Sequence, residues 1–297
     1  MLSTHFGKPI GRLENTKTIL HIIDPDSDIY KKQIEKIKKS RIQKISKCCR
    51  YHSLSYCKTT ECCNRCPIHY ESDSDEELED MGTKEFHIKG NIIPLPDFGQ
   101  RFNEYIAGPS GSGKTTMGVL LATEFQKAFP QKKIFVFSRT EAKKDPAYKN
   151  LKIKQIFIDE DLLTNPIDIT KEVSQKGCLI IFDDCGTIRD DKIRKEVEKL
   201  MCDSMEVGRK LDVNMIITNH LVIPNEKKFA RTLFNELTTF TFFPKSGSSQ
   251  QIMYSLQTYF GLSKSQILKI LQLDSRWVRI SKGYPNYILY SHGALIL

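Results

Sequence analysis

A glycine-rich turn carries the residues whose types and spacing most clearly indicate chemistry. The turn reads G-P-S-G-S-G-K-T-T and fits the phosphate-binding pattern G-x-x-x-x-G-K-[ST] at every fixed position. Backbone N–H groups in such a turn curl around a polyphosphate, so glycine is needed where a side chain would block the approach. Lys114 is expected to reach the β- and γ-phosphates, and the Thr115 hydroxyl to reach Mg²⁺. The residues expected to line the phosphate site are Gly108, Pro109, Ser110, Gly111, Ser112, Gly113, Lys114, Thr115 and Thr116.

Two adjacent carboxylates follow a strongly apolar stretch about 70 residues farther along the chain. The stretch C-L-I-I-F-D-D ends at Asp184, and four consecutive apolar residues are typical of a central strand in a parallel sheet. The carboxyl end of such a strand lies at the edge where a phosphate loop opens. We expect Asp183 to hold Mg²⁺, directly or through water, and Asp184 to polarise the attacking water. The alternative is that the pair caps the helix predicted to start near Ile188.

A third polar group follows the apolar stretch V-N-M-I-I-T, which ends at Thr218 and is followed by Asn219 and His220. A side chain at such a strand end can contact the γ-phosphate or the attacking water. We therefore expect His220 to sense hydrolysis, with a purely structural histidine as the alternative.

The elements that must position these groups are visible as hydrophobic patterns. Phe102 to Ala107 predicts a strand before the glycine-rich turn, and Thr116 to Phe129 predicts a helix ended by Pro130. An ordinary glycine turn between a strand and a helix is the alternative for the turn itself. Further strands are predicted at 133–138, 154–158 and 238–243, a charged helix at 190–210, two C-terminal helices at 250–260 and 263–271, and a strand pair at 277–280 and 287–290.

Size and composition limit the class of protein. A chain of 297 residues with 39% apolar residues can hold one large α/β domain and an appendage. The net charge of +9 favours an anionic partner such as nucleic acid, although surface solubility alone also explains it. No apolar run approaches the roughly 20 residues of a membrane helix, and the first 20 residues lack the apolar core of a signal peptide. We expect an intracellular, soluble protein.

The segment before residue 90 has a different character from the rest. Nine basic residues and one acidic residue between Lys31 and Arg50 predict a basic helix, which either binds phosphates or is simply solvated. Seven acidic residues between Glu71 and Asp80 predict a disordered linker. We therefore divide the chain into an N-terminal extension at 1–90, a core at 91–248 and a C-terminal segment at 249–297.

Six of the nine cysteines crowd between Cys48 and Cys66, which favours metal binding or free thiols over disulfides. The C-x₂-C step is half of a zinc site, and a tetrahedral site needs two further ligands. The zinc ligands we consider are Cys57, Cys63, Cys66 and His69, with Cys49 and Cys62 as alternatives. A reduced, flexible cysteine-rich linker is the other interpretation.

The order of several motifs resembles the poxvirus-type genome-packaging ATPases of nucleocytoplasmic large DNA viruses, which belong to the FtsK/HerA group. After the glycine-rich turn and L-I-I-F-D-D come M-E-V-G-R-K, a strand closing on T-N-H, and then F-F-P-K-S-G, Y-F-G-L-S-K-S-Q-I and S-R-W-V-R-I-S-K-G-Y-P-N-Y. The resemblance covers about Ile92 to Tyr290. It implies a RecA-like P-loop NTPase fold, in which a mostly parallel sheet is flanked by helices and a strand is added between the phosphate-loop strand and the acidic strand.

The same resemblance implies ATP and Mg²⁺ as ligands, a homo-oligomeric ring, and translocation of double-stranded DNA into a capsid, with a capsid or portal-site protein as partner. Assembly would take place in the host cytoplasm. Lys114 and Thr115 take the phosphate and Mg²⁺ roles, Asp183 the metal role and Asp184 the base role, where much of the group has Glu. Arg209 is the residue expected to reach a neighbouring subunit's γ-phosphate, with Arg189 and Arg194 as competitors.

Other classes fit the sequence less well. A GTPase would use Asp183 and Gly186 as D-x-x-G, but the later strand closes on N-H-L-V rather than on the guanine-reading N-K-x-D. A small-molecule kinase needs an acceptor site and lid arginines. A helicase or a nucleic-acid-binding regulatory protein with a structural nucleotide stays open as an alternative, and hydrolysis separates the regulatory protein from the motor.

Overall fold

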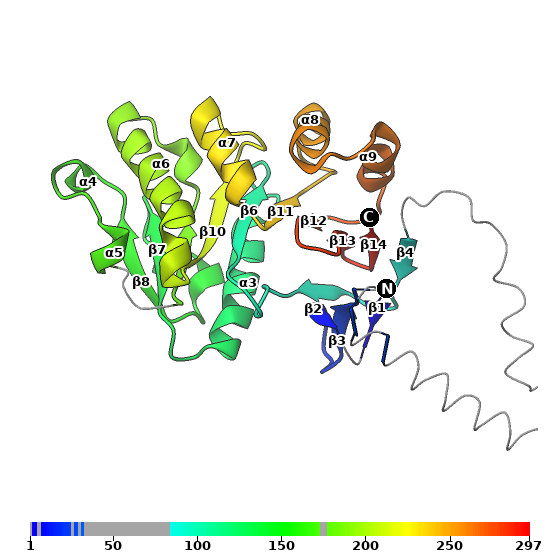
Figure 1. Ribbon diagram of the computed structural model, residues 1–297. Helices are drawn as coiled ribbons and strands as arrows, with labels where there is room; N and C mark the ends of the chain where they lie inside the picture. The colour runs from blue at the N-terminus through cyan, green and yellow to red at the C-terminus, as the bar shows by residue number, and fades with distance from the viewer. Residues whose placement is uncertain (1, 5–6, 25–26, 29–30, 33–83, 173–176) are drawn as a thin grey trace, which may run out of the picture. The chain divides into compact units, whose positions relative to one another are not determined.

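The computed structural model describes residues 2–4, 7–24, 27–28, 31–32, 84–172 and 177–297 (Figure 1). Leu2–Ile22 and Lys84–Leu297 form one compact unit. The proposed zinc ligands, the acidic linker and almost all of the basic segment lie outside the described residues. The predictions about zinc and about the linker therefore stay predictions.

A ten-stranded sheet forms the centre of the compact unit, in the order β4-β14-β13-β12-β11-β6-β10-β9-β7-β8. The strands from β11 to β8 run parallel, and the remaining four are antiparallel. The predicted mostly parallel sheet is confirmed, and β10 is the strand added between β6 and β9. The bounds are β4 Lys84–His87, β6 Asn103–Ala107, β7 Ile134–Ser138, β8 Ile153–Phe157, β9 Leu179–Phe182, β10 Asn214–Asn219, β11 Thr239–Phe242, β12 Val278–Ser281, β13 Tyr287–Tyr290 and β14 Gly293–Ile296.

Helices cover both faces of the parallel strands. Neighbouring residues of β9 point to opposite faces, so Ile180 packs with α6 and α7 while Ile181 packs with α3. Burial on both faces explains why these strands read as continuous apolar runs. Figure 1 shows α6 and α7 side by side on one of these faces. The helices are α3 Lys114–Ala128, α4 Asp161–Thr164, α5 Ile169–Glu172, α6 Asp191–Glu206, α7 Lys227–Glu236, α8 Ser249–Phe260 and α9 Lys264–Leu271, and the 3₁₀ turns are η1 Ala142–Lys144, η2 Pro146–Tyr148, η3 Cys185–Thr187 and η4 Gly208–Leu211.

A second, antiparallel sheet joins the first residues of the chain to the core. Its order is β1-β3-β2-β5, with bounds β1 Leu2–Ser3, β2 Lys8–Leu13, β3 Ile19–Ile22 and β5 Ile92–Pro94. Ile10 and Leu20 are buried against Leu289 of β13, and Arg12 pairs with Glu124 of α3 at 2.9 Å. Leu2–Ile22 thus belongs to the same unit as the glycine-rich turn, and the apolar side chains of β2 and β3 are buried there. The predicted N-terminal extension at 1–90 therefore does not include these residues.

The C-terminal segment continues the main sheet. The predicted helices at 250–260 and 263–271 are present as α8 and α9, and the predicted strand pair is present as β12 and β13. β12 pairs with β11, which in turn pairs with β6, so the C-terminal strands attach directly to the strand that leads into the glycine-rich turn. None of the helices in the described part of the chain has the length and apolar character that a membrane span requires.

A buried ion pair fastens β12 to β6. Arg279 and Glu104 are 1% exposed each, and Arg279 Nη2 lies 2.8 Å from Glu104 Oε2. Arg279 also donates to the carbonyl of Leu95, and the hydroxyls of Thr239 and Thr241 donate to Glu104. The charges are thus matched and their hydrogen-bonding capacity is used, which a buried pair requires.

Removing one partner of this pair should be costly. We expect Arg279→Met to lower the free energy of unfolding by about 3–5 kcal/mol, because Glu104 would be left as an unpaired buried charge. Urea denaturation of Arg279→Met, Glu104→Gln and the double variant measures the coupling, and the double variant should cost less than the sum of the two. Lys144→Met, which removes the exposed pair with Glu141, is the control and should change stability little. Additive costs would show that the buried pair is not coupled.

Candidate functional site

The phosphate loop, defined here as residues 108–116, leaves β6 and enters α3 at Lys114. Gly113 has φ 109°, in the left-handed region that favours glycine. A Cβ at Gly108 would lie 2.7 Å from Phe243 Cδ2 and 2.8 Å from Ser112 Oγ, so only glycine fits this approach. The Gly108 N–H donates to the Asn219 carbonyl at 3.1 Å, which ties the start of the loop to the end of β10. The predicted strand–loop–helix context is therefore present.

Lys114 is the buried cation of this loop. Its side chain donates from Nζ to the Pro109 carbonyl at 3.1 Å, across the loop, and the residue is 7% exposed. Burial lowers the pKa of the Lys114 ammonium, and the carboxylates of Asp184 and Asp183 oppose that shift. The predicted lysine and the two predicted aspartates therefore share one electrostatic environment.

Thr218 joins the two aspartates. Its hydroxyl donates to Asp183 Oδ1 at 2.8 Å and accepts from the Asp184 backbone N–H at 2.9 Å. Burial raises the pKa of the Asp183 carboxyl, and the hydrogen bond from Thr218 opposes the rise. Thr218 thus orients the carboxylate predicted to hold the metal, a role that the sequence analysis did not assign. Its position at the end of a strand next to the acidic strand was the available signal.

His220 lies between Asp184 and Lys114. Its Nε2 lies 2.8 Å from Asp184 Oδ2, and its Nδ1 lies 3.5 Å from Lys114 Nζ. A lysine ammonium can only donate, so Nδ1 accepts and Nε2–H donates to the carboxylate. The partners assign the neutral Nε2–H tautomer. The arrangement fits a base held in orientation by a histidine, which is more specific than the predicted sensing role.

Two buried polar atoms point to a ligand at this edge of the sheet. Asp184 Oδ1 and Ser112 Oγ are buried and have no hydrogen-bond partner among the described residues. The site residues therefore fit a bound phosphate chain and Mg²⁺, which takes hard oxygen ligands and keeps several waters. Thr115, partly exposed at the start of α3, and Asp183 are the side chains that would hold the metal. In the described parts of the chain no group of three His, Cys, Asp or Glu residues could hold a metal by itself.

Asp184 adopts a left-handed backbone with φ 54° and ψ 35°. Non-glycine residues in this region are uncommon, although aspartate tolerates it better than most. The conformation follows directly after β9 and starts η3, so it turns the chain sharply where the carboxylates are needed. Local strain of this kind is frequent at functional sites.

Arg209 lies away from the phosphate loop of its own chain. It belongs to η4, which precedes β10, whereas the site lies at the other end of β10, about 20 Å away for a strand of this length. Arg209 and the phosphate loop therefore lie at opposite ends of β10, and its predicted role stays a prediction. Arg189 follows η3 at the edge of the sheet where the aspartates lie.

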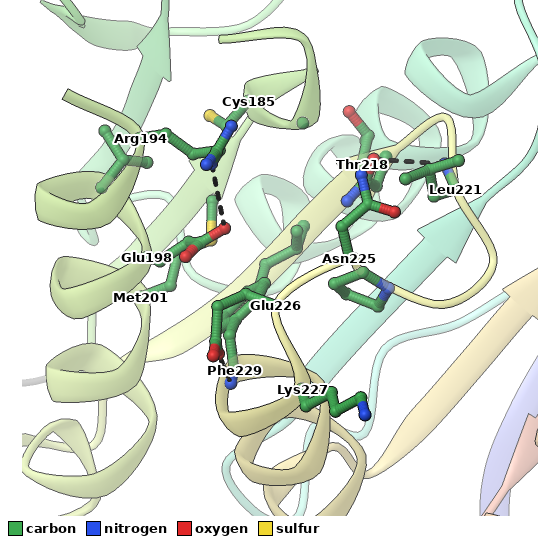
Figure 2. Close-up of a pocket in the computed structure, with 15 residues that line it drawn as sticks. Cys185, Arg194, Glu198, Met201, Thr218, Leu221, Asn225, Glu226, Lys227 and Phe229 are labelled. Atoms are coloured by element: carbon green, nitrogen blue, oxygen red, sulfur yellow. Dashed lines mark hydrogen bonds and ion pairs between the residues drawn. The ribbon is translucent and has the colours of Figure 1, made fainter. Parts of the chain in front are cut away.

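A cavity of about 500 Å³ lies beside this edge, between α6 and α7 (Figure 2). Figure 2 shows Arg194 and Glu198 on the α6 side, with Glu226 and Phe229 on the α7 side. Arg194 lies 2.7 Å from Asp191 and 4.0 Å from Glu198, so its guanidinium is engaged by carboxylates of its own helix. Burial raises the pKa of the Glu198 carboxyl, and Arg194 opposes this.

A second arginine that the sequence analysis did not select contacts the loop itself. Arg276 Nε donates to the Ser112 carbonyl at 3.1 Å, and Nη2 donates to the Gly111 carbonyl at 3.2 Å. The motif S-R-W-V was visible in the sequence, but nothing local in it indicates a contact with a loop 164 residues earlier.

Comparison with known proteins places the chain in a family. No family model matches the sequence. Over 222 residues, however, the chain is 40% identical to the uncharacterized protein V3 of Sputnik virophage, and the match covers 74% of this chain and 88% of V3. The chain belongs to the V3 family.

Solved structures similar to this V3-family chain have low identities. The cytoplasmic domain of EssC is 20% identical with a TM-score of 0.36, over 44% of this chain and 29% of that one. The genome packaging NTPase B204 from Sulfolobus turreted icosahedral virus 2, in complex with ATP-gammaS, is 10% identical with a TM-score of 0.43, over 61% of this chain and 92% of that one.

Adding a side chain at the first glycine of the phosphate loop of this V3-family chain should weaken phosphate binding. We expect Gly108→Ala to reduce affinity for a fluorescent ATP analogue at least about tenfold, because the new methyl group displaces Phe243 or Ser112. Gly99→Ala is the matched control, since a Cβ there meets only Asp97 Oδ1 at 3.6 Å. Equal affinity of the Gly108→Ala variant and the wild type, by fluorescence anisotropy, would contradict this account of the loop.

Proposed function

We propose that this protein is an ATP-hydrolysing motor that translocates viral double-stranded DNA into a capsid during virion assembly in the host cytoplasm. The observation that carries the proposal is the meeting of Lys114, His220 and Asp184 at one edge of the sheet, beside Asp183 and the phosphate loop. The order of motifs that resembles packaging ATPases, the membership of a virophage protein family and the net charge of +9 support the DNA-translocating part.

Each residue has a task in hydrolysis. Lys114 exchanges the Pro109 carbonyl for phosphate oxygens when the triphosphate enters, which compensates the burial of its charge. Asp184 accepts a proton from the water that attacks the γ-phosphorus, while the bond between that phosphorus and the leaving ADP oxygen breaks. His220 holds Asp184 Oδ2 by its Nε2–H, which leaves Oδ1 for the water. Mg²⁺ held at Thr115 and Asp183 neutralises charge on the phosphates when it is bound.

Replacing the proposed base, Asp184, should affect ATP turnover and not ATP binding. We predict that Asp184→Asn keeps ATP affinity but lowers kcat at least about 100-fold, because an amide cannot accept the proton. Lys114→Ala should lose both ATP binding and ATP hydrolysis, since it removes the contact with the phosphates. The measurement is ATPase activity of the whole chain with and without duplex DNA, together with binding of a fluorescent ATP analogue.

Two outcomes of the same experiment would change the assignment. If Asp184→Asn loses nucleotide binding, the residue belongs to the metal and not to the water. If the wild type binds ATP but hydrolyses none, with or without duplex DNA, the protein is a nucleic-acid-binding regulatory protein with a structural nucleotide. Hydrolysis without stimulation by DNA would separate the ATPase from the motor.

Arg209 is proposed to act on the nucleotide of a neighbouring subunit in a homo-oligomeric ring. Arg209→Ala should lower turnover by about 10³-fold or more, the effect of losing an arginine finger. Mixed rings of Arg209→Ala and Lys114→Ala subunits should regain activity, because an intact loop then meets an intact arginine at some interfaces. Arg189→Ala is the matched variant for the mixing experiment. Rescue of Arg189→Ala but not of Arg209→Ala would move the role to Arg189.

A further inference from the structure

The phosphate loop is held from outside by an arginine of the C-terminal strands. Arg276, an exposed residue just before β12, donates from Nε to the Ser112 carbonyl and from Nη2 to the Gly111 carbonyl. The side chain also lies close to the loop at Gly113, where a Cβ would be 3.6 Å from Nη2. One side chain therefore bonds two consecutive residues of the loop and leaves little room for a side chain at the third.

The chemistry of an anion-binding loop explains what such a contact does. A loop that turns its N–H groups inward toward phosphates turns carbonyls outward, and these carbonyls need donors of their own. Here the Gly111 and Ser112 carbonyls both accept from Arg276. A guanidinium offers several N–H groups in a fixed plane, so it can hold two neighbouring carbonyls at once, which a lysine ammonium does less well.

The backbone that carries Arg276 is firmly attached to the strand before the loop. Val278 of β12 is aligned with Phe242 of β11, and Phe242 is aligned with Ala107 at the end of β6. The buried pair of Arg279 and Glu104 fixes the same alignment three residues after Arg276. The guanidinium thus reaches the loop from a rigid support.

The turn that precedes β12 is also held. Ser275 Oγ donates to the Trp277 carbonyl at 2.5 Å and accepts from the Ser291 N–H at 3.0 Å. Ser275 itself is 2% exposed, so the residue that makes these bonds is buried. Ser275 and Trp277 therefore have fixed positions, and they hold the backbone of the exposed Arg276 between them.

We propose that Arg276 is a positioning residue for the nucleotide, which keeps the Gly111 and Ser112 carbonyls turned outward so that the phosphate loop is open to a triphosphate in the same chain. The inference rests on the proposed function and deepens it, because it makes the C-terminal strands part of the nucleotide site. Arg276 acts on the loop that binds the phosphates, whereas the attacking water is handled by Asp184 and His220.

The test compares binding and turnover in Arg276 variants. Arg276→Ala should raise the Kd for a fluorescent ATP analogue, and the KM for ATP, about tenfold, while kcat at saturating ATP stays within about twofold. Arg276→Lys keeps the charge but not the planar pair of donors and should recover only part of the affinity. Lys269→Ala is the control, since it removes an exposed cation of the same segment whose partner is Glu85 at 3.6 Å. Thermal unfolding of each variant checks that the fold is kept.

The outcomes separate the inference from the proposed function. A wild type that fails to bind the ATP analogue overturns the proposed function itself. A wild type that binds and hydrolyses ATP, beside an Arg276→Ala variant with the same KM, overturns the inference alone. A fall in kcat at unchanged KM would place Arg276 on the reacting phosphate and overturn the positioning role. Full recovery by Arg276→Lys would show that charge matters and the paired hydrogen bonds do not.

Discussion

The alignment of three parallel strands is the constraint on which the site depends. Ala107 at the end of β6 is level with Asn219 of β10, and Phe182 at the end of β9 is level with Ile217 of β10. The residues that follow Phe182 therefore come level with Thr218, which is why one hydroxyl can serve both aspartates. A slip of one residue would turn every side chain of β10 to the other face and would separate these groups.

The polar groups at this edge are costly to bury and are tolerated because they satisfy one another. Lys114 loses hydration inside the loop, and the carboxylates nearby together with the Pro109 carbonyl compensate it in part. His220 accepts from Lys114 at Nδ1 and donates to Asp184 from Nε2, so the neutral ring joins the cation to the carboxylate without adding a charge. Asp184 Oδ1 and Ser112 Oγ stay buried without a hydrogen-bond partner among the described residues.

The sequence was sufficient for features that depend on neighbouring residues. The glycine-rich turn, the acidic pair after an apolar run and the C-terminal helices are all encoded within short windows, and the structure contains them. Contacts between distant segments could not be predicted in this way. Arg276 meets Ser112 across 164 residues, and the strands before residue 23 look like an independent extension until their burial against β13 is known. The zinc prediction concerns residues outside the described part of the chain.

The left-handed turn at Asp184 has a consequence for the identity of the acid. Much of the group of genome-packaging ATPases that this sequence resembles has glutamate at this position. Glutamate is poorly suited to a backbone with positive φ, whereas the shorter aspartate adopts that conformation more readily. Side-chain length and main-chain handedness are therefore linked at this residue. A relative with glutamate at this position should have a different backbone path between the acidic strand and the following helix. The type of acid and the backbone conformation after the strand should therefore change together as relatives diverge.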